Sequence, residues 1–196
     1  MTKAEKTKQF IIEQAATIIN EKGISGTSID DVLKAAKVAK GCLYNHFESK
    51  DELSLACVDY LLGKLTERRD ALICRQATAT EKLHAFMEMN KNALNSLVTG
   101  GCPIVNLSTE SDDTNPVIKK KLKKVIEGYN KLFIQIIQEG IDAGEFSNKI
   151  NAEEFAFKMF TSIEGAGIMC RIMNSNKPMH IVISSLKTEL ETLRIN

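Results

Sequence analysis

The sequence predicts an all-α protein, and three observations support this fold class. The 196 residues include only three prolines, at positions 103, 116 and 178, so long stretches are free to form helices. No stretch keeps the alternation of apolar and polar residues that a half-buried strand requires. Capping boxes, in which a short polar residue is followed three positions later by an acid, mark helix starts at Ser28 with Asp31, Ser49 with Glu52, Thr78 with Glu81 and Asn151 with Glu154.

About nine helices follow from these starts and from the helical spacing of apolar residues. Asn115 followed by Pro116 marks a further start, because proline suits the first helical position. The predicted helices span 3–22, 28–36, 39–46, 50–74, 78–98, 116–143, 151–173 and 178–194, with a further helical turn near 104–110 inside the interruption at 99–114. Short helices precede long ones, which predicts an N-terminal domain over 1–50 and a larger domain over 51–196.

Composition and charge limit the classes of protein and partner. The chain is 43% apolar and 26% charged, as ordinary globular proteins are, and its net charge of +1 means that any anionic partner is held by local geometry. No apolar run is long enough to span a bilayer, and the charged N-terminus has no signal-peptide pattern. Five cysteines without C-x-x-C spacing indicate reduced thiols rather than a disulfide framework or a zinc site. We therefore expect a cytoplasmic protein with no membrane partner, no metal and no cofactor.

The first fifty residues have the pattern of a helix-turn-helix. An apolar stripe on helix 3–22 is predicted to be buried and consists of Phe10, Ile12, Ala15, Ala16 and Ile19. Helix 28–36 and a short helix at 39–46 follow, separated by a tight turn. In a helix-turn-helix the second of two such helices lies in the major groove of DNA.

The residue types on the short helix agree with that role. Leu43 and Phe47 lie four apart and are expected to anchor it to the other two helices. Gly41 costs about 1 kcal/mol relative to alanine inside a helix, which indicates close approach of another backbone such as that of DNA. Lysines and hydroxyl groups can bind phosphates, and side chains beside them can reach base edges. The predicted DNA-binding residues are Thr27, Ser28, Lys37, Ala39, Lys40, Gly41, Cys42, Tyr44, Asn45, His46 and Lys50.

The stretch GISGTSIDDVLKAAKVAKGCLYNHFESKDELSLACV, within residues 10–58, resembles the DNA-binding signature of the TetR family of bacterial repressors. The resemblance implies an all-helical regulator that binds a double-stranded DNA operator as a homodimer and responds to a small-molecule inducer. Two positions depart from the signature. Lys37 replaces the usual turn glycine, where a left-handed backbone is less comfortable. Ala39 replaces the usual Ser or Thr and forfeits a helix cap worth about 1 kcal/mol.

Each of these residues also has an ordinary structural interpretation. Tyr44 could belong to the core, Lys40 and Lys50 to a solvated face, and His46 to a helix end. Taken singly, each such interpretation is favoured, because isolated motif matches are weak. The joint spacing Lys40-Gly41-x-x-Tyr44-x-x-Phe47 favours DNA binding instead.

The last two long helices are implied by the resemblance to pair with their symmetry mates in a dimer. Gly165 and Gly167 in SIEGAGIMC remove side-chain bulk and are predicted to allow close helix approach at this dimer interface. The alternative is a kink or the wall of a ligand cavity.

The inducer pocket is implied to lie among the middle helices. Its predicted lining is Phe86, Met89, Cys102, Phe133, Phe160 and Met169, with Leu97, Ile163 and Met173 as further candidates. A stripe of Met and Phe is more often plain core. Cys102 belongs to a segment that resembles a TetR subgroup with G-C-x-x-x-N/K-x-x-x-E, some of whose members respond to electrophiles or oxidants. A helix start at Pro103 would favour a thiolate at Cys102, whereas the alternative is a small buried residue in a turn.

Two other classes of protein would each explain part of the sequence. Glu81-x-x-His84 has the ligand spacing of di-iron bundles, but such enzymes need a second copy of the motif, which the sequence lacks. No hydrolase or phosphate-loop motif occurs either. A helical scaffold that never touches DNA would explain the long helices and leave the Lys-Gly-x-x-Tyr-x-x-Phe spacing unexplained.

Overall fold

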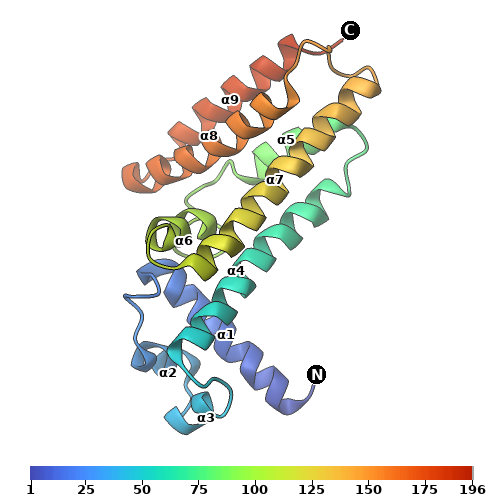
Figure 1. Cartoon of the computed structure of the whole chain (residues 1–196). Helices are drawn as coiled ribbons and strands as arrows, with labels where there is room; N and C mark the ends of the chain where they lie inside the picture. The colour runs from blue at the N-terminus through green and yellow to red at the C-terminus, as the bar shows by residue number, and fades with distance from the viewer. Residues whose placement is uncertain (196) are drawn as a thin grey trace. The chain divides into compact units, whose positions relative to one another are not determined.

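A computed structural model describes residues 1–195 of the chain, and this part is all-α as predicted (Figure 1). Its helices are α1 (Lys3–Lys22), α2 (Ile29–Ala36), α3 (Lys40–Tyr44), α4 (Lys50–Ile73), α5 (Ala79–Met89), α6 (Pro103–Ser111), α7 (Pro116–Asp142), α8 (Ala152–Met173) and α9 (Lys177–Thr192). None of the helices in this range combines the length and the apolar character that crossing a lipid bilayer requires.

The predicted helix starts are confirmed by the caps that form them. Ser28 and Thr78 make complete capping boxes with Asp31 and Glu81. The side chain of Asn151 accepts from the backbone N–H of Glu154. Local sequence therefore sets where most helices begin, because each cap satisfies amides that have no partner inside the helix.

Two sequence predictions need correction. The helix predicted over 78–98 ends at Met89, because the side chain of Asn90 donates to the carbonyl of Phe86 at 2.8 Å and the chain then leaves the helix. In the predicted apolar stripe of α1, Ala15, Ala16 and Ile19 are buried as expected, but Phe10 is 45% exposed and Ile12 half-buried, and the completely buried Ile11 completes the stripe in their place.

By its contacts the chain divides into two compact units. The first comprises Met1–Leu65 with Leu97–Leu122, and the second Thr66–Ser96 with Lys123–Asn196. In the first unit, α1 packs on α2 and on α6. Its core is apolar and includes Ile11, Leu43, Phe47, Leu53, Leu61 and Leu107. The predicted boundary at residue 50 separates a DNA-binding domain from a regulatory domain, and it stays a prediction.

The second unit is built around α8 and α9, which pack side by side (Figure 1). Glu145, just after α7, holds the start of α5. Its carboxylate accepts from the backbone N–H groups of Ala79 and Thr80 at 2.9 and 3.0 Å and from the Thr80 hydroxyl at 2.8 Å. A long-range carboxylate therefore supplements the local cap of that helix.

Candidate DNA-binding and regulatory sites

The turn between α2 and α3 is formed by an unusual lysine. Lys37 has φ 52° and ψ 41°, the left-handed conformation that usually belongs to glycine. Its N–H donates to the carbonyl of Leu33 and so ends α2. The side chain of Lys37 is exposed at this turn. The left-handed backbone is thus present even though lysine replaces the usual turn glycine at this position.

Helix α3 is short and presents polar residues outward from two buried anchors. Leu43 and Phe47 are almost completely buried, as predicted. Ala39 precedes the helix in an extended conformation and gives it no side-chain cap. Apart from its chain neighbours and the backbone of its own helix, no described atom lies within 4 Å of the place where a Cβ on Gly41 would stand, so this surface is open to a large partner. The outward residues are Lys40, Cys42, Tyr44, Asn45 and His46, of which Cys42 and His46 are half-buried.

The remaining predicted DNA-binding residues occupy different surroundings. Thr27 is buried, and its hydroxyl donates to the carbonyl of Gly23 at 2.6 Å, so this hydroxyl serves the packing of the α1–α2 turn. Ser28 is exposed and caps α2. Hydrogen bonds from Ser28, followed by the proximity of Lys22, hold the pKa of Asp31 well below its usual range. Lys50 is half-buried at the first position of α4.

A polar cluster joins the end of α1 to the start of α6. Asn20 is 3% exposed, and its side-chain amide donates to the carbonyls of Thr99 and Gly101 at 2.8 and 3.0 Å. The amide of Asn106 on α6 donates to the backbone carbonyl of Asn20 at 2.9 Å and to the carbonyl of Gly100 at 3.0 Å. Cys102, half-buried, is the residue immediately before α6, as the sequence predicts.

Glu110, near the end of α6, holds the α1–α2 turn. Its carboxylate accepts from the backbone N–H groups of Ile24 and Ser25, both at 2.7 Å. Burial alone would raise the pKa of Glu110, but these two amides outweigh it and keep the pKa below the ordinary value. The sequence analysis did not identify the roles of Asn106 and Glu110, although both lie in the G-C-x-x-x-N-x-x-x-E segment, because their partners at the end of α1 and in the α1–α2 turn are more than eighty residues away.

An aromatic cluster forms the interior of the second unit. Phe86 and Phe133 have ring centroids 4.5 Å apart, and Tyr129 lies 5.2 Å from Phe160. Three predicted pocket residues, Phe86, Phe133 and Phe160, are thereby brought together. Met89 is half-buried on α5, whereas Met169 is 50% exposed on α8 and lies outside this cluster. Cys102 belongs to the first unit.

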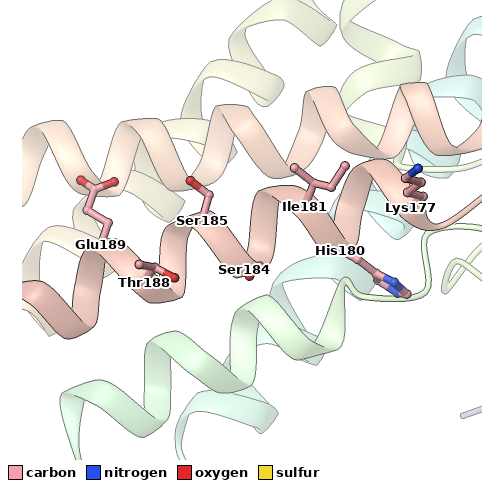
Figure 2. A pocket seen from close by; sticks show the side chains of 7 residues that line it. All are labelled: Lys177, His180, Ile181, Ser184, Ser185, Thr188 and Glu189. Atoms are coloured by element: carbon pink, nitrogen blue, oxygen red, sulfur yellow. The ribbon is translucent and has the colours of Figure 1, made fainter.

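The outer face of α8 and α9 is unusually apolar. Phe157, Ile172 and Ile181 are each more than half exposed, and Ile168, Met169 and Met173 are also exposed. Figure 2 shows a groove along α9 that is lined by Lys177, His180, Ile181, Ser184, Ser185, Thr188 and Glu189. Gly165 and Gly167 lie on α8, and no described atom comes within 4 Å of a Cβ built on Gly165.

The Glu-x-x-His motif on α5 is used locally. Glu81 accepts from the backbone N–H of Thr78 at 3.1 Å and of Ala77 at 3.0 Å. Burial, followed by the charge of Lys187, lowers the pKa of His84. Residues 1–195 bring no three His, Cys, Asp or Glu side chains together in a group that could hold a metal.

Known proteins share both the sequence pattern and the fold described above. Residues 11–57 match the model of bacterial regulatory proteins of the tetR family, and residues 79–186 match the tetracyclin repressor-like C-terminal domain. A crystal structure of a TetR transcriptional regulator from Chloroflexus aurantiacus superposes with a TM-score of 0.95 at 32% identity, covering 100% of both chains. The chain belongs to the TetR family.

Two curated members of the family illustrate the range of its relatives. The HTH-type transcriptional repressor DhaR of Mycobacterium sp. strain GP1 is 24% identical over 172 residues, which cover 88% of this chain and 86% of DhaR. The fatty acid metabolism regulator protein of Bacillus subtilis strain 168 is 25% identical over 181 residues, or 92% of this chain and 91% of that protein. The family to which the chain belongs consists of transcriptional regulators and not of enzymes.

Proposed function

We propose that this TetR-family protein is a cytoplasmic repressor that binds a palindromic operator as a homodimer and releases it when a small molecule binds or a cysteine is modified. The observation that carries the proposal is the division of buried and exposed side chains along α3 and the three residues that follow it. Leu43 and Phe47 are buried, while Lys40, Gly41 and Tyr44 face outward. This arrangement suits a helix that is inserted into the major groove.

The chemistry of the outward residues supports phosphate and base contacts. Lys37, Lys40 and Lys50 can neutralise phosphates, and the Tyr44 hydroxyl can donate to a phosphate oxygen. Gly41 allows the DNA backbone to approach the first turn of α3. Asn45, His46 and Cys42 lie beside them, where base edges would be read.

The exposed face of α8 and α9 supports the homodimer. A twofold dimer presents two α3 helices to half-sites about 34 Å or a multiple of this apart. Phe157, Ile168 and Ile172 share this face of α8, and Ile181 extends it onto α9. An apolar surface of this kind marks an interface. Gly165, on α8 between Phe157 and Ile168, would let the partner helix come close.

Coupling between inducer and DNA would pass through α6. Cys102 immediately precedes this helix, and Asn106 and Glu110 hold the end of α1 and the α1–α2 turn. Cys102 directly follows Gly100 and Gly101, whose carbonyls accept from Asn106 and Asn20, so a group attached to its sulfur would add volume next to this segment. Displacement of α6 would then move the α1–α2 turn and with it α3.

The proposal is tested by titrating the protein against duplex from the upstream region of its own gene at two salt concentrations. Binding that weakens steeply with salt is expected, because phosphate contacts release counterions. Undetectable or salt-independent binding would refute the repressor.

The proposed release of DNA on modification of Cys102 is tested with a matched control variant. Cys102→Ser should abolish release of DNA by N-ethylmaleimide, whereas Cys74→Ser removes an exposed thiol and should leave the response intact. Release that persists in Cys102→Ser would assign the response to another group.

A further inference from the structure

Arg69 on α4 is a buried cation with an unused donor. The residue is only 8% exposed, and its Nη1 atom is buried without a hydrogen-bond partner in the described chain. Nε and Nη2 lie 2.8 and 2.7 Å from the same carboxylate oxygen of Asp70. An arginine keeps its charge at physiological pH, so the Nη1 edge directs positive charge and N–H groups into the protein.

Such an atom needs an explanation, because proteins rarely bury a charged donor without an acceptor. Asp70 does not supply one for Nη1: its side chain is 60% exposed and occupies the opposite edge of the guanidinium. The adjacent Arg68 is exposed. Of the two adjacent arginines on α4, only Arg69 is therefore buried.

The surroundings of Arg69 are aromatic. Its guanidinium carbon lies 4.2 Å from the centroid of the Tyr129 ring. Tyr129 is 5.2 Å from Phe160 and 6.1 Å from Phe86 between ring centroids. Helices α4, α5, α7 and α8 each contribute a side chain here, so a cationic group and an apolar surface meet inside the second unit.

Arg69 is also the only charged residue classed as buried among residues 1–195. Asp70 already pairs with Nε and Nη2, so the Nη1 donor is what remains for a ligand, and it suits the single carboxylate of a monoanion. A planar carboxylate accepts well from a guanidinium edge, and a dianion would need further buried cations.

We propose that Arg69 anchors the inducer and that the inducer is an apolar monocarboxylic acid. One carboxylate oxygen accepts from Nη1, and the aromatic or acyl body of the acid lies against Tyr129, Phe86 and Phe160. This inference rests on the proposed function, since it names the ligand class to which the regulator responds.

The test uses the full-length protein and two pairs of probes of matched shape, benzoate with benzamide and octanoate with octanamide. Dissociation constants are measured by calorimetry in the absence of DNA. The wild type is expected to bind at least one acid about thirtyfold or more tightly than its neutral amide, the usual effect of removing one partner of a buried charged pair.

Variants then assign the preference to one side chain. Arg69→Gln should remove the preference for the acid. Arg68→Gln, which changes the exposed neighbouring arginine, should keep this preference. Asp70→Asn removes a competing anion and should tighten binding of the acid. If Arg69→Gln fails to fold, Arg69→Lys keeps the charge and should retain a weakened preference for the acid.

Three results would overturn the proposal: acid and amide binding equally well to the wild type, an unchanged preference in Arg69→Gln, or binding of none of the four probes. A gel-shift assay with operator DNA distinguishes failure of the inducer proposal from failure of the proposed repressor function. A protein that binds its operator but none of the acids is a repressor with another inducer, whereas one that binds acids but no DNA is not the proposed repressor.

Discussion

Asn106 on α6 donates its side-chain amide to the backbone carbonyl of Asn20 on α1 at 2.9 Å, across 86 residues of sequence. The same nitrogen also donates to the carbonyl of Gly100 at 3.0 Å. Because Asn20 is almost completely buried, loss of either amide would leave carbonyl groups without donors. This contact fixes the position of α6 relative to the end of α1.

Gly100→Ala should destabilise this contact strongly. Gly100 has φ +105°, and a Cβ there would stand 2.6 Å from the carbonyl oxygen of Asn20. Backbone strain and the clash together should lower the free energy of unfolding by about 2 kcal/mol or more. Denaturant unfolding measures this. Gly144→Ala is the control, because Gly144 has φ +74° with no described atom within 4 Å, and it should cost only about 1 kcal/mol. Equal effects would mean that the approach to Asn20 is unimportant.

Glu110→Gln should lower stability in a pH-dependent way. The folded pKa of Glu110 lies below its ordinary value, so its contribution is present above the ordinary value and is lost as pH falls through the folded pKa. The wild type should be more stable than the variant near pH 7, and the difference should shrink between about pH 5 and pH 3. Other carboxylates affect both proteins alike. Thermal unfolding at several pH values in this range measures the difference in stability between the wild type and the variant. A difference that stays constant with pH would contradict the assignment.

Tyr44→Phe and Lys50→Ala should weaken operator binding without unfolding the protein. Loss of one phosphate hydrogen bond per subunit should cost about fivefold or more in affinity. Lys50→Ala should also reduce the slope of log affinity against log salt by about two per dimer, because two phosphate contacts are lost. Gel-shift titration at several salt concentrations measures both, with circular dichroism to confirm folding. Unchanged affinity in both variants would remove these residues from the DNA-binding site.

Ala39→Ser should stabilise the protein by about 1 kcal/mol. Ala39 already has the extended backbone of an N-cap, with φ −72° and ψ 151°, and lacks only the oxygen that would accept an amide of α3. Denaturant unfolding would show the gain. Ala39→Val, which adds bulk without an acceptor, should show none, and a similar gain in both would point away from capping.

Ile172→Lys should convert the protein to a monomer. Ile172 is 81% exposed on the apolar face of α8, so the charge would be buried only in a dimer. Sedimentation velocity compares it with Val117→Lys on α7, where Val117 is 52% exposed on another helix and the dimer should persist. A dimer of Ile172→Lys with unchanged affinity would place the interface elsewhere.

Local chemistry made much of this protein predictable. Ser28 and Thr78 mark helix starts with partners three residues away, and the spacing of Leu43 and Phe47 marks the side on which α3 and the residues after it are anchored. The end of α5 was not predictable in the same way, because it depends on a side-chain bond from Asn90 that competes with continued helix. The contacts of Asn106, Glu110 and Arg69 join distant parts of the chain. Residue type indicates that such groups need partners, but only the tertiary structure identifies which partners they have.

The carboxylate of Glu110 has a consequence for protein engineering. Residues 1–65 alone would leave the amides of Ile24 and Ser25 and the side chain of Asn20 without the partners that residues 97–122 supply. A chimaera that grafts these first helices onto another regulator should therefore carry the α6 segment with them. The transplantable unit is discontinuous in sequence, and a cut made after α3 would divide it.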